Sequence, residues 1–249
     1  APSSVRGLVT SSFDAYEVDL HGHRAVYRAA GSGPTVVLIH GGKSTGAKLQ
    51  QAMPGADVVV IYEPGLSEVY DEKTGLASKF PTLDGLLAQF APGWSRGEPL
   101  VLLGFSAGAW ALRYYLRDPS ARDAISAAIF LDGLYGNSGS QCNLAPYAGV
   151  IAYGKEANAD PSRKRLVMTY SAAHPGPGIC SNAIAAAVGP GSGVFVRGYA
   201  NGDHGAQQNT VGPAVVSELI APWIGKGASL THMAAAGLAL AGMGIAAAI

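Results

Sequence analysis

The sequence predicts an α/β fold, with a mostly parallel central sheet of about eight strands flanked by helices. Six short runs are hydrophobic throughout, instead of alternating between polar and apolar residues. Such runs are typical of strands that are buried on both faces of a parallel sheet. Segments suited to amphipathic helices lie between the runs, and this alternation indicates the α/β class. The runs span residues 35–40, 57–63, 99–105, 127–132, 165–171 and 193–199.

Two further strands are expected ahead of these runs, at 16–20 and 24–30, where polar and apolar residues alternate. His21, Gly22 and His23 separate the two segments, so the pair is predicted to form a hairpin of half-exposed strands. Helices are expected at 44–53, 81–90, 107–117, 181–188 and 211–224.

The chain of 249 residues is expected to form one large domain over 16–225, after an N-terminal extension at 1–15. Its 17 basic and 17 acidic side chains cancel, and the sequence contains no basic run. This balance gives no electrostatic reason to expect a nucleic-acid partner. The opening segment lacks the apolar core of an uncleaved signal peptide, while Ala1 leaves a mature N-terminus after cleavage open. Localisation stays open, with a secreted or surface-associated protein favoured over a cytoplasmic one.

The last segment, 226–249, is expected to be a linker followed by an apolar helix. Residues 233–249 are 17 consecutive apolar residues, close to the minimum length of a membrane-spanning helix. Eleven of them are Ala or Gly, and Gly237 and Ala241 stand four apart, as in close helix–helix contacts. Self-association through a docked helix, membrane contact and a disordered tail all stay open as interpretations.

The turn after the third expected strand reads HGGKSTG, from His40 to Gly46, and permits two interpretations. A phosphate-binding loop would need a glycine five residues before Gly42, but Val37 occupies that position inside the strand. Without that glycine the loop has no room to curl around a phosphate. The turn therefore suits a loop that offers backbone N–H groups to an oxyanion.

The segment Gly104-Phe105-Ser106-Ala107-Gly108 lies directly between an expected buried strand and an expected helix. A serine on so sharp a turn takes a strained backbone. Glycine is needed two residues away on each side, because a side chain there would collide with neighbouring elements. The following helix points its N-terminus at the serine, where the helix dipole favours developing negative charge. Ser106 is therefore the expected nucleophile.

These features resemble the α/β-hydrolase superfamily, and the resemblance covers about 16–224. It rests on the turn at Ser106, on the HGG turn and on the order of the strands around them. The resemblance implies an oxyanion hole made by the N–H groups of Ala107 and Gly42, with Lys43 as a near alternative. It implies no cofactor and no metal.

The same resemblance implies a chain order of serine, acid and histidine. After Ser106, His174 follows the seventh expected strand, His204 follows the last one, and His232 borders the apolar tail. The superfamily carries its base after the last strand, which assigns that role to His204.

The expected acid is Asp132, at the end of the sixth expected strand. The loop after the seventh strand, where the superfamily most commonly carries its acid, contains no carboxylate. Some members place the acid after the sixth strand instead. A carboxylate that closes a buried strand needs a partner, and an imidazole N–H would serve. Asp203 directly precedes His204 and is not expected to reach its ring.

Weaker candidates for substrate contact are Glu63, Phe105 and Tyr135. Glu63 and Tyr135 follow expected strands at the carboxyl edge of the sheet, where such folds bind ligands. Packing or solvent exposure is the alternative for these two residues.

Cys142 and Cys180 lie on the loops expected after the sixth and seventh strands, so a disulfide between them is geometrically possible. Buried or free thiols are the alternatives. Residues 133–164 leave room for a helix and a loop between those strands, and a large lid is therefore not expected.

The leading hypothesis is a cofactor-independent serine hydrolase in which Ser106 attacks an acyl carbonyl, His204 moves the proton and Asp132 orients the imidazole. The resemblance favours an ester as substrate, with an amide or thioester as lesser alternatives, and the acyl and alcohol parts are not specified. The competing hypothesis is a catalytically inactive hydrolase-fold module for binding or assembly, anchored by its apolar C-terminal helix.

Overall fold

The central feature of the computed structural model is an eight-stranded sheet. The structure describes residues 14–16, 26–40, 43–61, 76–135, 141–171, 175–199 and 203–224. The strands are β1 Asp14–Tyr16, β2 Val26–Ala29, β3 Thr35–Ile39, β4 Asp57–Ile61, β5 Leu100–Phe105, β6 Ala127–Leu131, β7 Arg165–Ser171 and β8 Val194–Tyr199.

The strand order is β1-β2-β4-β3-β5-β6-β7-β8. The strands β4, β3, β5, β6, β7 and β8 are all parallel to their neighbours, whereas β1 pairs with β2, and β2 with β4, in antiparallel fashion. The predicted fold class is therefore confirmed, and each of the six apolar runs contains one of the parallel strands.

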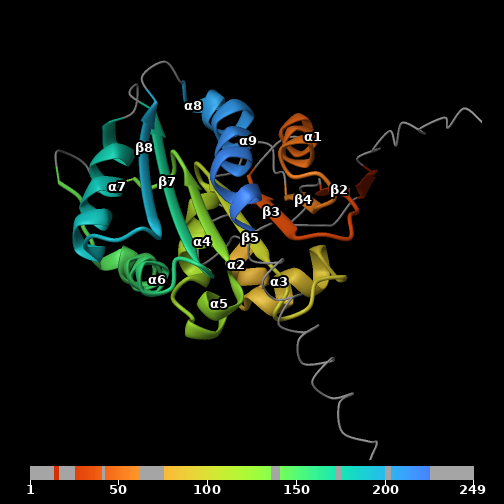
Figure 1. Cartoon of the computed structure of the whole chain (residues 1–249), viewed down its shortest axis with the longest axis horizontal. Helices are drawn as coiled ribbons and strands as arrows, with labels where there is room; N and C mark the ends of the chain where they lie inside the picture. The colour runs from red at the N-terminus through yellow and green to blue at the C-terminus, as the bar shows by residue number, and fades with distance from the viewer. Residues whose placement is uncertain are drawn as a thin grey trace, which may run out of the picture.

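Helices cover both faces of the sheet, as Figure 1 shows. The α-helices are α1 Lys43–Ala52, α2 Leu76–Lys79, α3 Leu83–Phe90, α4 Gly108–Tyr115, α5 Pro119–Ala124, α6 Ala148–Ala159, α7 Pro175–Val188, α8 His204–Ala206 and α9 Gly212–Val215. A 3-10 turn at Ala145–Tyr147 precedes α6, and π-helical segments at Gln207–Val211 and Val216–Ile220 flank α9.

The sheet separates two apolar cores. One contains α1 and the helical run around α9, and the other contains α3, α4, α6 and α7. Neighbouring residues of β3 belong to different cores, with Val37 and Ile39 in one and Val36 and Leu38 in the other. Because both faces are covered, every residue of β3 is buried, which explains why the run is apolar throughout.

Several helices, among them α2 and α8, differ from the expected set, and two of the differences have reasons in local chemistry. The helix expected at 181–188 begins at Pro175 in α7, because a proline at the start of a helix lacks only an N–H that the helix would not use. The helix α5 was not expected at all. It begins after Asp118, whose side chain accepts a hydrogen bond from the Ser120 N–H at 2.9 Å, and Pro119 opens its first turn.

The connection from β5 to α4 is so tight that its two glycines cannot carry a side chain. A Cβ atom on Gly108 would lie 2.2 Å from the carbonyl oxygen of Ile39, and one on Gly104 would lie 2.8 Å from Ala109 Cα. Ser106, between them, has a positive φ of 49°. The predicted steric reason for glycine at both positions is therefore confirmed.

Ser106 is one of three non-glycine residues with positive φ among the described ranges. The others are His40, with a φ of 65°, and Asp132, with a φ of 48°. Each directly follows the carboxyl end of its strand, β3, β5 or β6, and these three strands are neighbours in the sheet. Backbone conformations that are unfavourable for non-glycine residues are thus concentrated at one edge of the sheet.

A disulfide joins Cys142 to Cys180, with their Cα atoms 5.0 Å apart. Cys142 lies just before the 3-10 turn that leads into α6, and Cys180 is fully buried within α7. The crosslink ties the segment after β6 to the helix after β7.

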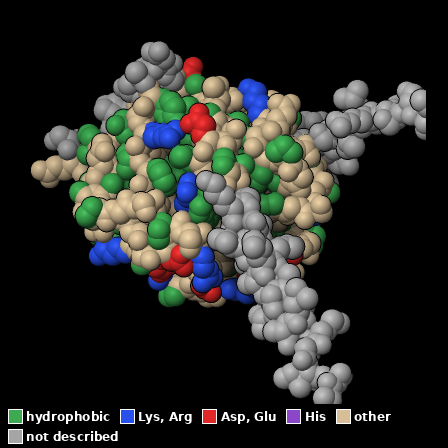
Figure 2. Space-filling view, viewed as in Figure 1, with side chains coloured by type: hydrophobic (Ala, Val, Ile, Leu, Met, Phe, Trp, Pro, Cys, Tyr) green, Lys and Arg blue, Asp and Glu red, His purple; other side chains and the backbone are tan. Residues whose placement is uncertain are grey.

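No helix within the described ranges is long and apolar enough to cross a membrane. Residues 1–13 and 225–249 lie outside the described residues, so the expectations for the N-terminal extension and for 233–249 stay predictions. On the face in Figure 2, basic and acidic side chains are interspersed among apolar and other polar ones.

Removing the disulfide is expected to lower the free energy of unfolding. In the chain-entropy account, breaking a disulfide between cysteines with a sequence separation of 38 lowers the free energy of unfolding by about 4 kcal/mol. Urea unfolding of the wild type with and without reductant measures this loss. The Cys142→Ala/Cys180→Ala variant serves as control, because the chain has no other cysteine and its unfolding curve should not respond to reductant. Superimposable wild-type curves would contradict the expectation.

Gly108→Ala is expected to destabilise the protein by about 1–3 kcal/mol, because the new methyl group would overlap the Ile39 backbone. Gly176→Ala in α7 is the matched control, since a Cβ at that position meets nothing within 4 Å. Urea unfolding of both variants checks the difference. Equal stability of the two variants would show that the crowding at Gly108 is relieved elsewhere.

Candidate active site

Three strand ends bring the expected catalytic side chains to one edge of the sheet. Ser106 follows β5, Asp132 follows β6, and His204 follows β8 as the first residue of α8. Because parallel strands end at the same edge, residues 72 and 98 positions apart in the chain become neighbours.

The three side chains form a hydrogen-bonded row. His204 Nε2 lies 2.8 Å from Ser106 Oγ, and His204 Nδ1 lies 2.7 Å from Asp132 Oδ2. An ionised carboxylate can only accept, so Nδ1 carries the imidazole proton. Nε2 then remains as the acceptor for the Ser106 hydroxyl.

The Asp132 carboxylate is 0% exposed, and the protein compensates its burial on both oxygens. Oδ1 accepts a hydrogen bond from the Ser171 N–H at 2.9 Å, and Oδ2 faces His204. The Asp132 N–H donates to the Thr169 carbonyl at 3.0 Å, which fixes the backbone next to β7. The end of β7 therefore supports the carboxylate without contributing one.

A second layer lies beneath this support. The Thr169 hydroxyl lies 2.7 Å from Gln207 Oε1, and Gln207, three residues after His204, is fully buried. Sequence reasoning did not find Ser171, Thr169 or Gln207. A backbone N–H carries no residue-type signal, and the contact between Thr169 and Gln207 spans 38 positions.

Asp203 takes a different role from that of an acid next to His204. Its side chain accepts a hydrogen bond from the Ala206 N–H at 2.6 Å and thereby caps the N-terminus of α8. This cap fixes the start of the helix whose first residue is His204.

Phe105 packs between two imidazole rings. Its ring centroid lies 5.8 Å from that of His40 and 4.7 Å from that of His204. Phe105 is only 4% exposed, so its position favours packing over substrate contact.

His40 directly follows β3, and its N–H donates to the Ile61 carbonyl at 2.9 Å. Burial, with a smaller contribution from the nearby His204, lowers the pKa of His40 below its ordinary value of 6.5. His40 is therefore neutral at pH 7.

Tyr135 lies on the segment after β6 with its hydroxyl 3.5 Å from Ser106 Oγ. Its ring centroid lies 6.4 Å from that of His204, and the residue is half-buried. Burial is the main cause that raises the pKa of Tyr135, with a smaller contribution from Asp132. The hydroxyl therefore keeps its proton at neutral pH.

The expected oxyanion donors Ala107 and Lys43 lie at the starts of two helices. Ala107 is the N-cap of α4 and Lys43 is the first residue of α1, and the first N–H groups of a helix have no partner within that helix. Gly42, Glu63 and His174 lie outside the described residues, so their expected places stay predictions.

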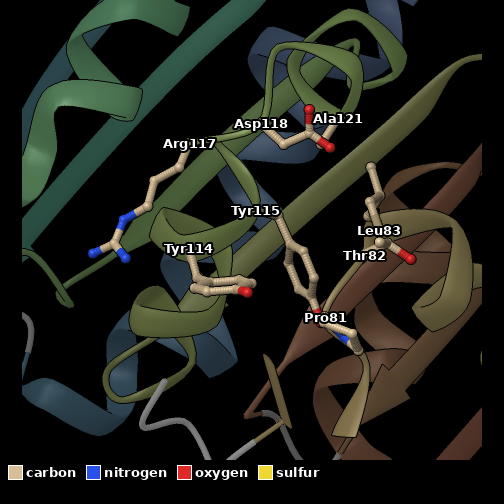
Figure 3. A pocket seen from close by; sticks show the side chains of 8 residues that line it. All are labelled: Pro81, Thr82, Leu83, Tyr114, Tyr115, Arg117, Asp118 and Ala121. Atoms are coloured by element: carbon tan, nitrogen blue, oxygen red, sulfur yellow. The ribbon is translucent and has the colours of Figure 1, made fainter. Parts of the chain in front are cut away.

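A cavity of about 310 Å³ lies far from this row, at the other end of α4. Figure 3 shows its lining, with the Tyr115 ring reaching from α4 toward Pro81. Within the described ranges, no group of three or more His, Cys, Asp or Glu side chains could hold a metal ion.

No protein-family model matches the sequence, and no curated protein matches it. Solved structures do match the fold. An IroE-like serine hydrolase from Shewanella oneidensis superposes with a TM-score of 0.56 at 17% identity, covering 84% of this chain and 79% of that one. EstE1, a carboxylesterase cloned from a metagenomic library, gives a TM-score of 0.54 at 16% identity, covering 87% of this chain and 89% of that one.

A loop variant of the haloalkane dehalogenase DbeA from Bradyrhizobium elkanii is also similar, with a TM-score of 0.53 at 12% identity, covering 88% of this chain and 99% of that one. Proteins with different names and reactions thus share this architecture, and the likeness shows the fold alone. All three are members of the α/β-hydrolase superfamily. The chain has the α/β-hydrolase fold.

Proposed function

We propose that the protein is a serine hydrolase that cleaves esters through an acyl-enzyme formed on Ser106. The observation that carries the proposal is the hydrogen-bonded row of Asp132, His204 and Ser106. A serine hydroxyl is a poor nucleophile unless a base accepts its proton and a third group orients that base. The row supplies both groups at hydrogen-bonding distance.

In the proposed reaction, Ser106 Oγ attacks the acyl carbonyl while His204 Nε2 accepts the hydroxyl proton. Asp132 holds the imidazole in the required tautomer and stabilises the imidazolium that forms. His204 then returns the proton to the leaving alcohol as the bond between acyl carbon and alcohol oxygen breaks. Water repeats the sequence on the acyl-enzyme, and Ser106 is restored.

The oxyanion of the tetrahedral intermediate would be bound by backbone N–H groups. Ala107 supplies one at the amino end of α4, and Gly42 or Lys43 would supply the second from the turn after β3. These donors matter because they bind charge that appears only in the transition state. Losing one such donor typically reduces the rate by about a hundred- to a thousand-fold.

An ester is proposed as the substrate because EstE1, which shares the fold, is described as a carboxylesterase. Ser106 is partly exposed, and the described part of the chain between β6 and β7 contains α6 and a 3-10 turn. Both features are compatible with an accessible nucleophile.

Fluorophosphonate labelling tests the nucleophile directly. We expect modification at Ser106 in the wild type, none in Ser106→Ala, and a rate reduced by about 10³- to 10⁴-fold in Asp132→Asn, because the amide no longer holds the reactive tautomer. Mass spectrometry of the digested protein identifies the modified residue. Asp118→Asn is the matched control, since Asp118 caps α5 and an Asn can replace it there. Folded wild-type protein that takes up no label would overturn the proposal.

Acidification is expected to destabilise the protein through His40. Its folded-state pKa lies below 6.5, so the unfolded chain takes up this proton first as the pH falls. The stabilising contribution of neutral His40 is therefore fully present above the unfolded pKa and is lost as the pH falls toward the folded one. The loss is at most about 1.4 kcal/mol per pH unit between the two pKa values.

Urea unfolding of the wild type and His40→Asn between about pH 7.5 and pH 5 measures this contribution. Asparagine tolerates the positive φ at this position and does not titrate. We expect the free energy of unfolding to fall more steeply in the wild type. Parallel pH profiles would contradict a lowered pKa at His40.

A further inference from the structure

The position of Tyr135 is set by the chain that leaves β6. Gly133 lies against the nucleophile turn so closely that a Cβ would be 2.6 Å from the Ser106 carbonyl oxygen. Leu134 is buried in the core on the helix α4 face. The Tyr147 hydroxyl donates to the Tyr135 carbonyl at 2.5 Å. The chain is therefore held in place from Gly133 to the Tyr135 carbonyl.

The Tyr135 hydroxyl has a single hydrogen-bonding neighbour among the described residues, Ser106 Oγ at 3.5 Å. This distance is too long for a strong hydrogen bond between two hydroxyls. Ser106 Oγ is already engaged by His204 at 2.8 Å. The tyrosine hydroxyl is thus aimed at the nucleophile but free to bond an atom placed beside it.

The order of the strands indicates which substrate atom would lie beside the Tyr135 hydroxyl. Strand β5 lies between β3 and β6, so His40, which follows β3, and Tyr135, which follows β6, lie after strands on opposite sides of the strand that leads to Ser106. The flank of β6 is also the one from which His204, after β8, reaches the serine. The leaving oxygen must lie next to His204 Nε2, because that atom returns the proton to it.

We propose that the Tyr135 hydroxyl donates a hydrogen bond to the leaving alcohol oxygen of the ester. This inference rests on the proposed function and extends it to a further catalytic residue. As the bond between acyl carbon and alcohol oxygen breaks, negative charge develops on that oxygen. Tyr135 stabilises the charge and keeps its own proton, while the proton that is transferred comes from His204.

The proposed hydrogen bond from Tyr135 favours one class of ester as substrate. A donor to the leaving oxygen matters most when the alcohol is a weak acid, as aliphatic alcohols are, because more charge must then be stabilised before the proton arrives. It matters least for an acidic alcohol such as p-nitrophenol, which leaves as a stable anion. Esters of unactivated aliphatic alcohols are therefore the substrates that Tyr135 would favour.

The test compares kcat/KM for acetate esters with a common acyl group and leaving groups of decreasing acidity: p-nitrophenyl, phenyl and ethyl acetate. The value of kcat/KM reports only the steps up to acyl-enzyme formation, so hydrolysis of the shared acyl-enzyme does not enter. We expect Tyr135→Phe to lower kcat/KM about ten- to a hundredfold for ethyl acetate. For p-nitrophenyl acetate the change in kcat/KM should stay within about threefold. The dependence of kcat/KM on the pKa of the leaving alcohol should therefore be steeper in Tyr135→Phe than in the wild type.

Tyr114→Phe is the matched control, because it removes the same atom from a tyrosine that lines the cavity at the far end of α4. It should leave all three values unchanged. Equal losses for the three esters in Tyr135→Phe would indicate a structural role and overturn the inference, as would no loss at all. If the wild type hydrolyses none of the three esters, or if its activity persists in Ser106→Ala, the proposed function itself is overturned, and the inference with it.

Discussion

The crowding of three neighbouring strand ends is the constraint on which the rest of the site depends. The start of α4 is pressed against the end of β3 at Gly108, and the chain leaving β6 is pressed against the same turn at Gly133. His40, Ser106 and Asp132 all take positive φ where these strands end. Each such residue costs on the order of 1–3 kcal/mol, and only the surrounding packing keeps it in that conformation.

This crowding orients the side chains that lie above it. Two of these residues, Ser106 and Asp132, contact His204 through their side chains. The two apolar cores hold the strands rigidly below that point. The hydrogen bonds of His204 therefore join groups that the surrounding packing already holds in place, which is the preorganisation that the proposed reaction requires.

Most of the architecture could be predicted from the sequence because its signals are local. Continuous apolar runs identify doubly covered strands, and the spacing of Gly104, Ser106 and Gly108 identifies the sharp turn. The helices α5 and α7 were harder to predict, because proline and glycine at a helix start look like turn residues. The sequence alone cannot show contacts that depend on distance in space, such as the Ser171 N–H on Asp132 or the Tyr135 hydroxyl beside Ser106.

The place of Asp132 has a consequence for how the molecule can vary. The carboxylate comes from the end of β6, and β7 supports it through its backbone: the Ser171 N–H donates to Asp132 Oδ1, and the Thr169 carbonyl accepts from the Asp132 N–H. The disulfide at Cys180 anchors α7 independently of the connection from β7 to α7. The hydrogen-bonded row of Asp132, His204 and Ser106 takes no side chain from between β7 and α7, so that connection can differ in length and composition while the row keeps its geometry. The connection is the natural point for insertion or grafting in this scaffold.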